Sequence, residues 1–340
     1  MPLLENVYMR HPFLKRLMVG SGALGLWRTF NKTPRVLFYH GVDTIFDSSV
    51  QTLHLQPDVF EAEMLYLKKH YEVISMDEFY ERLASACFSG REVVITFDDG
   101  YRNNLTVAAP ILSSLSLPFT VFVSVEHLEK GKRFPTFINR AILLKAPLSH
   151  IRIDCLDINC DLTTDIDRIA VMKRINKALK HSDIKTVNQI CSQLESNLSS
   201  DRLEELYSRY SSDAPMNWDE LKELKQNHKC IIGSHCLDHF ICHSSQQKEE
   251  VCRQIFESKR VIQQKIGGEC AYLAFPNGNF KQGDISEEAL AAVQQAGYKL
   301  AFTTMNERLT RKSGPFLLPR CAARFELLDF KVKLALQPRW

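Results

Sequence analysis

One short stretch decides the fold: residues 93–101, which run Val93-Val94-Ile95-Thr96-Phe97-Asp98-Asp99-Gly100-Tyr101. Its first part is β-branched or aromatic, which is typical of a buried strand. Two carboxylates and a glycine follow, and these residue types favour a turn. Acids at the end of an apolar strand lie where α/β folds place their chemistry, at the carboxyl edge of a sheet or barrel. The alternative is an ordinary solvated turn after a strand.

A second apolar run ends in polar residues in the same way. It covers residues 231–239 and contains His235 and His239. On a helical turn, this spacing would place both imidazoles on one face, with their Cβ atoms about 5–6 Å apart. Two imidazoles and one carboxylate form a common divalent-metal site, in which Asp98 or Asp99 would be the third ligand. The alternative is two unrelated surface histidines, because the chain contains 11.

Together these motifs resemble those of the polysaccharide deacetylase family, the NodB-homology carbohydrate esterases. The resemblance extends, in the family's order, over roughly residues 35–125 and 215–325. The segments that carry it are Leu37–Val42, Thr96–Tyr101, Asn217–Leu221, the histidine motif, Ala274–Gly278, Ala301–Thr304 and Leu318–Arg320. The resemblance implies a distorted, incomplete (β/α)7 barrel in the α/β class.

The resemblance also implies a division of roles within the site. Asp99, His235 and His239 would hold one divalent ion, for which zinc is expected, and Asp98 would be the general base. The reaction would be hydrolysis of the N-acetyl or N-formyl group of an amino sugar in a polysaccharide or lipid-linked glycan. The residues expected to contact this carbohydrate substrate are Tyr101, His40, Trp218, Pro276, Asn277 and Arg320.

The chain departs from the family pattern in two places. Arg320 stands where the family has a histidine that protonates the leaving amine, and an arginine cannot serve as a general acid. Arg320 could instead orient Asp98 or bind an anionic group of the substrate. The general acid is left unassigned, with His40 and His243 as candidates. The family's arginine before the proline loop is also missing.

The order of strand and helix patterns agrees with a barrel of parallel β/α units. We expect one barrel domain over residues 35–340, interrupted by a mostly helical insertion over residues 126–214. Within the insertion we expect a small hairpin and three helices. Long insertions at an active-site face commonly shape the substrate pocket. Outside it, the predicted helices include 57–71, with Asp58 as its N-cap, and 103–115.

Residues 1–34 form a separate N-terminal segment in this prediction. Cations precede a short apolar run, Leu17 to Trp27, which is well below the roughly 20 residues that span a bilayer. A helix with peripheral membrane contact through residues 10–30 is one interpretation. A helix that packs on the body of the protein is the other. Without a recognisable cleavage site, we expect a cytoplasmic protein, with the inner membrane face as its place of contact.

The composition is that of a globular protein, and it excludes some function classes. The hydrophobic fraction is 45%, the charged fraction 24% and the formal net charge +3. No basic tract interleaved with aromatics is present, so we expect no nucleic-acid partner. The 10 cysteines include no Cys-x-x-Cys pair, which argues against a structural zinc site and favours reduced thiols. The alternatives to the N-deacylase are an O-deacetylase and a catalytically weak or inactive glycan-binding barrel.

Overall fold

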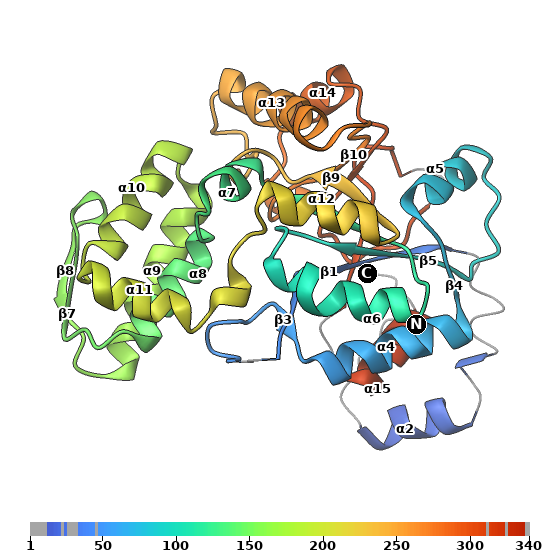
Figure 1. Cartoon of the computed structure of the whole chain (residues 1–340), viewed down its shortest axis with the longest axis horizontal. Coiled ribbons are helices and arrows are strands. Elements are labelled where there is room, and N and C mark those ends of the chain that lie inside the picture. The colour runs from blue at the N-terminus through green and yellow to red at the C-terminus, as the bar shows by residue number, and fades with distance from the viewer. Residues whose placement is uncertain are drawn as a thin grey trace.

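The computed structural model describes residues 12–21, 24–25, 33–44, 47–310, 313–323 and 326–336. Its centre is a curled, parallel β-sheet with helices around it, a distorted and incomplete barrel as expected (Figure 1). Along the sheet the strands follow the order β11-β10-β9-β6-β5-β1-β12, and β4 pairs with β5. The strands are β1 (Arg35–Tyr39), β4 (Glu72–Val73), β5 (Glu92–Phe97), β6 (Phe119–Val123), β9 (Cys230–Ser234), β10 (Tyr272–Ala274), β11 (Leu300–Phe302) and β12 (Cys321–Ala322).

The central strand is β5, and every one of its residues is buried. It pairs in parallel with β1 along its whole length, from Arg35 opposite Val93 to Tyr39 opposite Phe97. On its other side it pairs with β4 at its start and with β6 at its end. Burial on both faces explains why this strand is a continuous apolar run rather than an alternating one.

The outer helices begin and end at recognisable signals. Ser75, Asn217 and Ser286 each cap a helix by accepting a backbone hydrogen bond. The prediction that Asp58 caps its helix is wrong: Gln56 is the N-cap, and Asp58 lies in the first turn. The helices are α4 (Pro57–His70), α5 (Met76–Ala84), α6 (Ala109–Ser114), α12 (Trp218–Asn227), α13 (Lys248–Ile266), α14 (Glu287–Gln295) and α15 (Leu327–Leu336).

Short elements complete the barrel. A π-helix (Asn104–Ala108) precedes α6, so the predicted helix over residues 103–115 is two consecutive helical segments. A closing strand was expected at Leu318–Arg320, and β12 lies directly after it, whereas α15 was not predicted. The chain segment before β12 links the two edges of the sheet, because Leu318 bridges to Phe302 of β11 while β12 pairs with β1. The remaining short elements are β2 (Gly41–Val42), β3 (His54–Leu55) and 3-10 turns at Asp154–Leu156, Ser211–Asp213 and Phe280–Gln282.

The insertion forms a lobe beside the barrel, drawn in green and yellow in Figure 1. It has a hydrophobic core of its own, which includes Phe137, Ile142, Ile175 and Ile190. The predicted hairpin and three helices are confirmed, whereas α7 and α8 were not predicted. The elements are α7 (Val125–Lys130), α8 (Pro135–Lys145), β7 (His150–Ile153), β8 (Ile158–Asp161), α9 (Asp165–His181), α10 (Ile184–Glu195) and α11 (Ser200–Ser208).

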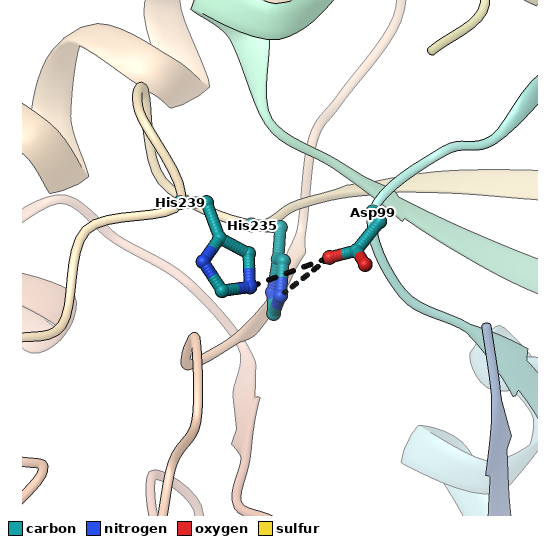
Figure 2. A group of neighbouring side chains, drawn as sticks. All are labelled: Asp99, His235 and His239. Atoms are coloured by element: carbon teal, nitrogen blue, oxygen red, sulfur yellow. Dashed lines mark ion pairs between the residues drawn. The ribbon is translucent and has the colours of Figure 1, made fainter. Parts of the chain in front are cut away.

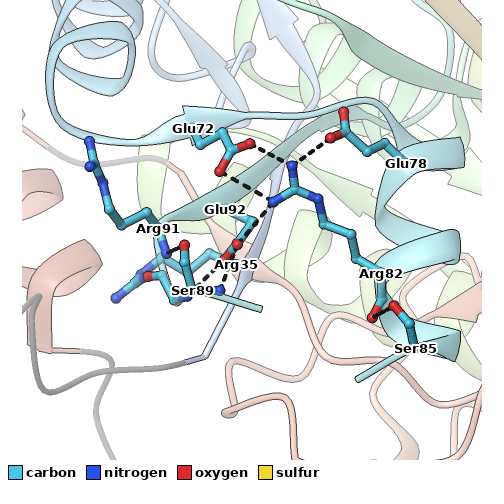
Figure 3. Close-up of polar contacts among 9 residues, drawn as sticks. Arg35, Glu72, Glu78, Arg82, Ser85, Ser89, Arg91 and Glu92 are labelled. Atoms are coloured by element: carbon cyan, nitrogen blue, oxygen red, sulfur yellow. Dashed lines mark hydrogen bonds and ion pairs between the residues drawn. The ribbon is translucent and has the colours of Figure 1, made fainter. Parts of the chain in front are cut away.

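At the opposite end of the barrel from the carboxyl edge, a polar network fixes the start of β5. The guanidinium of Arg82 contacts three carboxylates, those of Glu72, Glu78 and Glu92 (Figure 3). Glu92 is buried, and it also accepts hydrogen bonds from the backbone N–H groups of Ser89 and Gly90 at 2.7 and 2.8 Å. The network therefore satisfies a carboxylate that would otherwise be costly to bury.

The described part of the N-terminal segment is α2 (Pro12–Gly20), which packs against α15 (Figure 1). This contact agrees with the interpretation of a helix on the body of the protein. Most of the other residues between 10 and 30, through which membrane contact was expected, lie outside the described residues, and nothing observed supports that contact. Across the described ranges, no helix is both long and apolar enough to cross a membrane.

A buried carboxyl between β1 and α4 gives the fold a pH dependence. Tyr39 donates a hydrogen bond to Glu63 at 2.8 Å, and burial raises the pKa of Glu63 from 4.5 to about 8. The folded state therefore binds this proton more tightly than the unfolded state, so the stabilisation is complete below pH 4.5 and is lost as the pH rises to about 8. We expect the free energy of unfolding of the wild type to fall by on the order of 2–4 kcal/mol over this window.

The Glu63→Gln variant should lack this part of the pH dependence, because its amide carries no charge and its oxygen still accepts from Tyr39. Urea unfolding at pH 5 and pH 8.5 measures the difference. The control is Glu61→Gln, an exposed residue of the same helix, which should keep the wild-type dependence. Equal pH dependence in the wild type and Glu63→Gln would show that Glu63 does not titrate as described.

Candidate active site

Polar side chains collect at the carboxyl edge of the sheet, where the parallel strands end. Asp98 and Asp99 follow β5, and His235 follows β9 directly. Between these two strands lies β6, which pairs with both. The sheet order therefore brings two motifs that are far apart in sequence to the same end of the barrel.

The backbone at this edge is held in unusual conformations. Asp99, Cys236 and His239 have positive φ values of 74°, 60° and 52°. Such values cost non-glycine residues of order 1–3 kcal/mol each and cluster at functional sites. They also show that residues 235–239 form an irregular turn, so the two imidazoles do not share the face of a helical turn. Gly100 (φ 76°) has no such penalty, and a Cβ there would lie 2.8 Å from Val123.

Asp99, His235 and His239 turn their side chains toward one point (Figure 2). Oδ1 of Asp99 lies 3.5 Å from Nε2 of His235 and 3.4 Å from Nε2 of His239. All three ligand atoms lie within 4.8 Å of one another. Ligands at about 2.0–2.2 Å around a tetrahedral ion are separated by roughly 3.3–3.6 Å, so the observed carboxylate–imidazole spacings suit such an ion.

The contact of Nδ1 decides which ring nitrogen of His235 carries the proton. Nδ1 of His235 lies 2.7 Å from the carbonyl oxygen of Ala274, the last residue of β10. A carbonyl only accepts hydrogen bonds, so Nδ1 carries the proton and Nε2 presents a lone pair to Asp99. This arrangement, in which a backbone carbonyl orients a metal-binding imidazole, is common around metal sites.

Packing positions the other histidine. The ring of Phe134 lies edge-on to that of His239, with centroids 5.6 Å apart, and stacks on His127 at 4.2 Å. His235 lies on another side of His239, at a centroid distance of 5.0 Å. Phe134 precedes α8, so a residue of the insertion helps to orient a candidate ligand.

The electrostatics of these three residues fit a cation. Burial raises the pKa of Asp99 to about 6, and burial lowers the pKa of His239 to about 4. Oδ1 of Asp99 is buried and has no hydrogen-bond partner among the residues that the structure describes. Buried polar atoms are normally satisfied, and this oxygen faces a nitrogen lone pair. The residues present therefore fit one divalent ion, which would satisfy all three atoms.

Asp98 points away from this cluster and pairs with Arg320. Nη1 and Nη2 of Arg320 each donate to one oxygen of the Asp98 carboxylate at 2.7 Å. Burial favours the protonated acid, but Arg320, through its charge and its hydrogen bonds, and His235 together outweigh burial and lower the pKa of Asp98 to about 2. Asp98 is therefore ionised throughout the neutral range, and its orientation is fixed by a two-point contact.

Arg320 is itself fully buried, with 0% of its surface exposed. Its Nε donates to the carbonyl of Thr303, and its guanidinium lies over the ring of Phe38 at 4.7 Å. Arg320 does not line the site pocket, so the expectation that it contacts the substrate is not met. Of the two roles left open for it, the structure supports the orientation of Asp98.

The site opens into a pocket of about 510 Å³ between the barrel and the insertion. Asp98, Asp99, His235 and His239 line one side of it. Much of the rest is lined by the insertion, from Phe134 on α8's N-terminal side to Val187 on α10. The expectation that the insertion shapes the pocket is thus supported.

The structure brings only some of the expected substrate-binding residues to this pocket. His40 and Asn277 line it. Tyr101 is buried beneath it, against Phe134, and Pro276 forms the turn before Asn277. Trp218 lies elsewhere, and its indole N–H donates to Glu129 on α7.

The two candidates for the general acid differ in position. His40 follows β1 and lines the pocket with Asp98. His243 is not among the pocket residues, and its ring nitrogens contact Ser245 at 2.6 Å and Gln246 at 2.8 Å. The geometry therefore favours His40.

Sequence reasoning missed the pocket residues of the insertion, and Phe134 and Arg140 are two of them. Neither belongs to a motif, and their position depends on how α8 packs against the barrel. The only signal available from the sequence was the interruption of the barrel pattern by a long insertion.

Comparisons with known proteins identify the family of the chain. The sequence profile described as polysaccharide deacetylase matches residues 85–142 and 161–301, more than half of the chain. No curated protein matches the chain.

Solved structures show the same fold. The Streptococcus pyogenes deacetylase PplD, in complex with acetate, has a TM-score of 0.59 at 16% identity, covering 89% of this chain and 98% of that one. IcaB from Ammonifex degensii has a TM-score of 0.58 at 15% identity, covering 90% and 97%. A de-N-acetylase from Aggregatibacter actinomycetemcomitans has a TM-score of 0.50 at 16% identity, covering 85% and 94%. The chain belongs to the polysaccharide deacetylase family and is a hydrolase of carbon–nitrogen bonds other than peptide bonds.

Proposed function

We propose that the chain removes an N-acetyl or N-formyl group from an amino sugar of a polysaccharide or lipid-linked glycan, and that the reaction requires one divalent metal ion. One observation carries this proposal: Asp99, His235 and His239 point three ligand atoms at one place in the pocket wall. Three protein ligands leave coordination positions for water and substrate, which is typical of catalytic rather than structural sites.

Zinc is the ion that we propose. Two imidazoles and one carboxylate suit Zn²⁺, whereas Mg²⁺ and Ca²⁺ prefer oxygen ligands alone. When bound, such an ion would polarise the amide carbonyl and lower the pKa of water.

The chain's own residues supply the proton transfers. Asp98 lines the pocket as an ionised carboxylate, and Arg320 holds it in one orientation, so we propose Asp98 as the base that accepts a proton from the attacking water. Departure of the amine requires a proton donor, and His40 on the same pocket wall is the residue that we propose.

Three observations support a carbohydrate amide as the substrate. The family to which the chain belongs is that of polysaccharide deacetylases. One protein of similar fold is a de-N-acetylase, and another was solved with acetate, the product that N-deacetylation would release. The pocket volume suits a ligand of sugar size, since small-ligand sites span about 300–1,000 Å³.

Acetate and formate release tests the proposal. The purified chain is freed of metal with a chelator, restored with zinc or left without it, and incubated with N-acetylglucosamine oligomers and their N-formyl counterparts. We expect the chain to release acetate or formate from one of these two substrates, and to do so only after zinc is restored. An Asp99→Ala variant should release neither, whereas Asp219→Ala, an exposed acid on α12, should behave as the wild type.

Equal release with and without metal would overturn the metal dependence. Release from O-acetylated but not N-acylated sugars would show an O-deacetylase. Glycan binding without release of either acid would favour the inactive glycan-binding barrel.

A further inference from the structure

The pocket contains two cationic side chains, and both come from the insertion. They are Arg140 on α8 and Lys180 on α9. Arg320 does not line the pocket, and it is neutralised by Asp98. What Arg140 and Lys180 contact therefore decides whether the pocket can attract an anion.

Lys180 is already neutralised. Its ammonium group lies 3.2 Å from Oδ1 of Asp284 and donates to Gln282 at 3.0 Å. Both partners belong to the barrel, so Lys180 ties the insertion to the barrel across the pocket. Its charge is not available to a ligand.

Arg140 is anchored but not neutralised. Its Nε donates to the carbonyl of Val50 at 2.7 Å, which fixes the plane of the guanidinium. Within the ranges that the structure describes, its Nη1 and Nη2 make no hydrogen bond and no ion pair. Two other arginines of the insertion differ, because Arg133 and Arg168 donate their Nη groups to backbone carbonyls.

The acids near Arg140 have other partners. Burial lowers the pKa of Arg140, and the opposing attractions of Tyr101, Asp213 and Asp99 do not cancel it. Asp213 lies 2.8 Å from Nε2 of His54 and accepts from Gln51 at 3.0 Å. Asp99 faces the two histidines of the candidate metal site. A partly buried guanidinium whose Nη groups lack a partner is unusual, because buried polar groups are normally hydrogen-bonded.

We propose that Arg140 binds an anionic group of the substrate, so that the N-acylated sugar carries, or lies next to, a phosphate or a carboxylate. The two free Nη groups can donate to two oxygens of either anion, which is the contact that a planar guanidinium favours. Arg140 lines the same pocket as Asp99, His235 and His239, so the anion and the amide belong to one ligand. This inference rests on the proposed function, because it takes the ligand in the pocket to be the N-acylated glycan substrate.

Calorimetric titration of the full chain with three probes tests the inference. They are N-acetylglucosamine 1-phosphate, an N-acetylglucosamine–glucuronate disaccharide and neutral diacetylchitobiose. We expect at least one anionic probe to bind about 10-fold or more tightly than the neutral one, the effect of a charge-assisted hydrogen bond. Comparing the affinities for the phosphate probe and the glucuronate probe shows whether the site prefers a phosphate or a carboxylate.

The Arg140→Gln variant should lose most of this preference while binding the neutral probe as before. Arg140→Lys, which keeps the charge but not the two-point contact, should give an intermediate preference. The matched control is Lys177→Gln, an exposed cation of α9 outside the pocket lining, which should retain the full preference. Melting temperatures establish that the variants are folded.

Equal affinity for anionic and neutral probes, or a preference that survives in Arg140→Gln, would overturn the inference. The second result would place the anion elsewhere, for example on the metal. If the proposed function failed but the inference held, the chain would not hydrolyse the amide, yet it would still bind anionic probes more tightly than neutral ones in a way that depends on Arg140. Conversely, hydrolysis without any such preference would leave the proposed function standing and remove the anion site.

Discussion

The Asp98→Asn variant is expected to hydrolyse N-acyl sugars about 10²–10⁴-fold more slowly than the wild type, the usual contribution of a positioned general base. The amide keeps the shape of the carboxylate but cannot accept a proton. Zinc binding should persist, because Asp98 points toward Arg320 and not toward the two histidines. Single-turnover rates and zinc affinity, measured on the same preparation, separate the two effects.

Asp219→Asn provides the control, since it makes the same chemical change at an exposed position. A rate for Asp98→Asn within a few-fold of the wild type would show that another group is the base. His40 would then be the first residue to test, because it lines the same pocket.

The second large effect is expected from the Arg320→Met variant, in stability. Removing the guanidinium leaves the carboxylate of Asp98 buried without its partner, which typically costs about 3–5 kcal/mol of unfolding free energy. The double variant Arg320→Met, Asp98→Asn should recover much of that loss, because no unpaired charge remains. Urea unfolding of the single and double variants measures the coupling.

Arg152→Met is the matched control, because Arg152 pairs with Asp154 at the surface. Exposed ion pairs contribute about 0–1 kcal/mol, so this variant should unfold almost as the wild type does. A cost for Arg320→Met no greater than that of the control would show that the buried pair does not stabilise the fold.

The sequence predicted those parts of the fold that local patterns determine. The apolar run before Asp98 is β5, as the sequence predicts. The convergence of Asp99 with His235 and His239 was also foreseen, because parallel strands end at one edge of a sheet. That inference needed only the strand assignments and the family's order of motifs.

Features that depend on long-range packing could not be predicted from local sequence patterns. The pairing of Arg320 with Asp98 joins residues 222 positions apart, and the sequence left it as one of two alternatives. The irregular turn at Cys236 and His239, with its positive φ values, could not be predicted from the spacing of the two histidines. Arg140 is recognisable as a candidate anion-binding residue only after the insertion is placed against the barrel.

The central claim is that Asp99, His235 and His239 hold a metal ion, and zinc stoichiometry tests it most directly. Metal content is measured after equilibration with zinc and dialysis, for the wild type and for the His235→Ala, His239→Ala double variant. A second double variant, His150→Ala, His181→Ala, removes two exposed histidines as a control.

We predict about one zinc ion per chain in the wild type and the control, and none in the His235→Ala, His239→Ala variant. Zinc at 100 times its Kd should also add about 2.7 kcal/mol of stability to the wild type and to the control, but not to the site variant. A wild type without zinc under these conditions, or equal zinc in the site variant, would contradict the account.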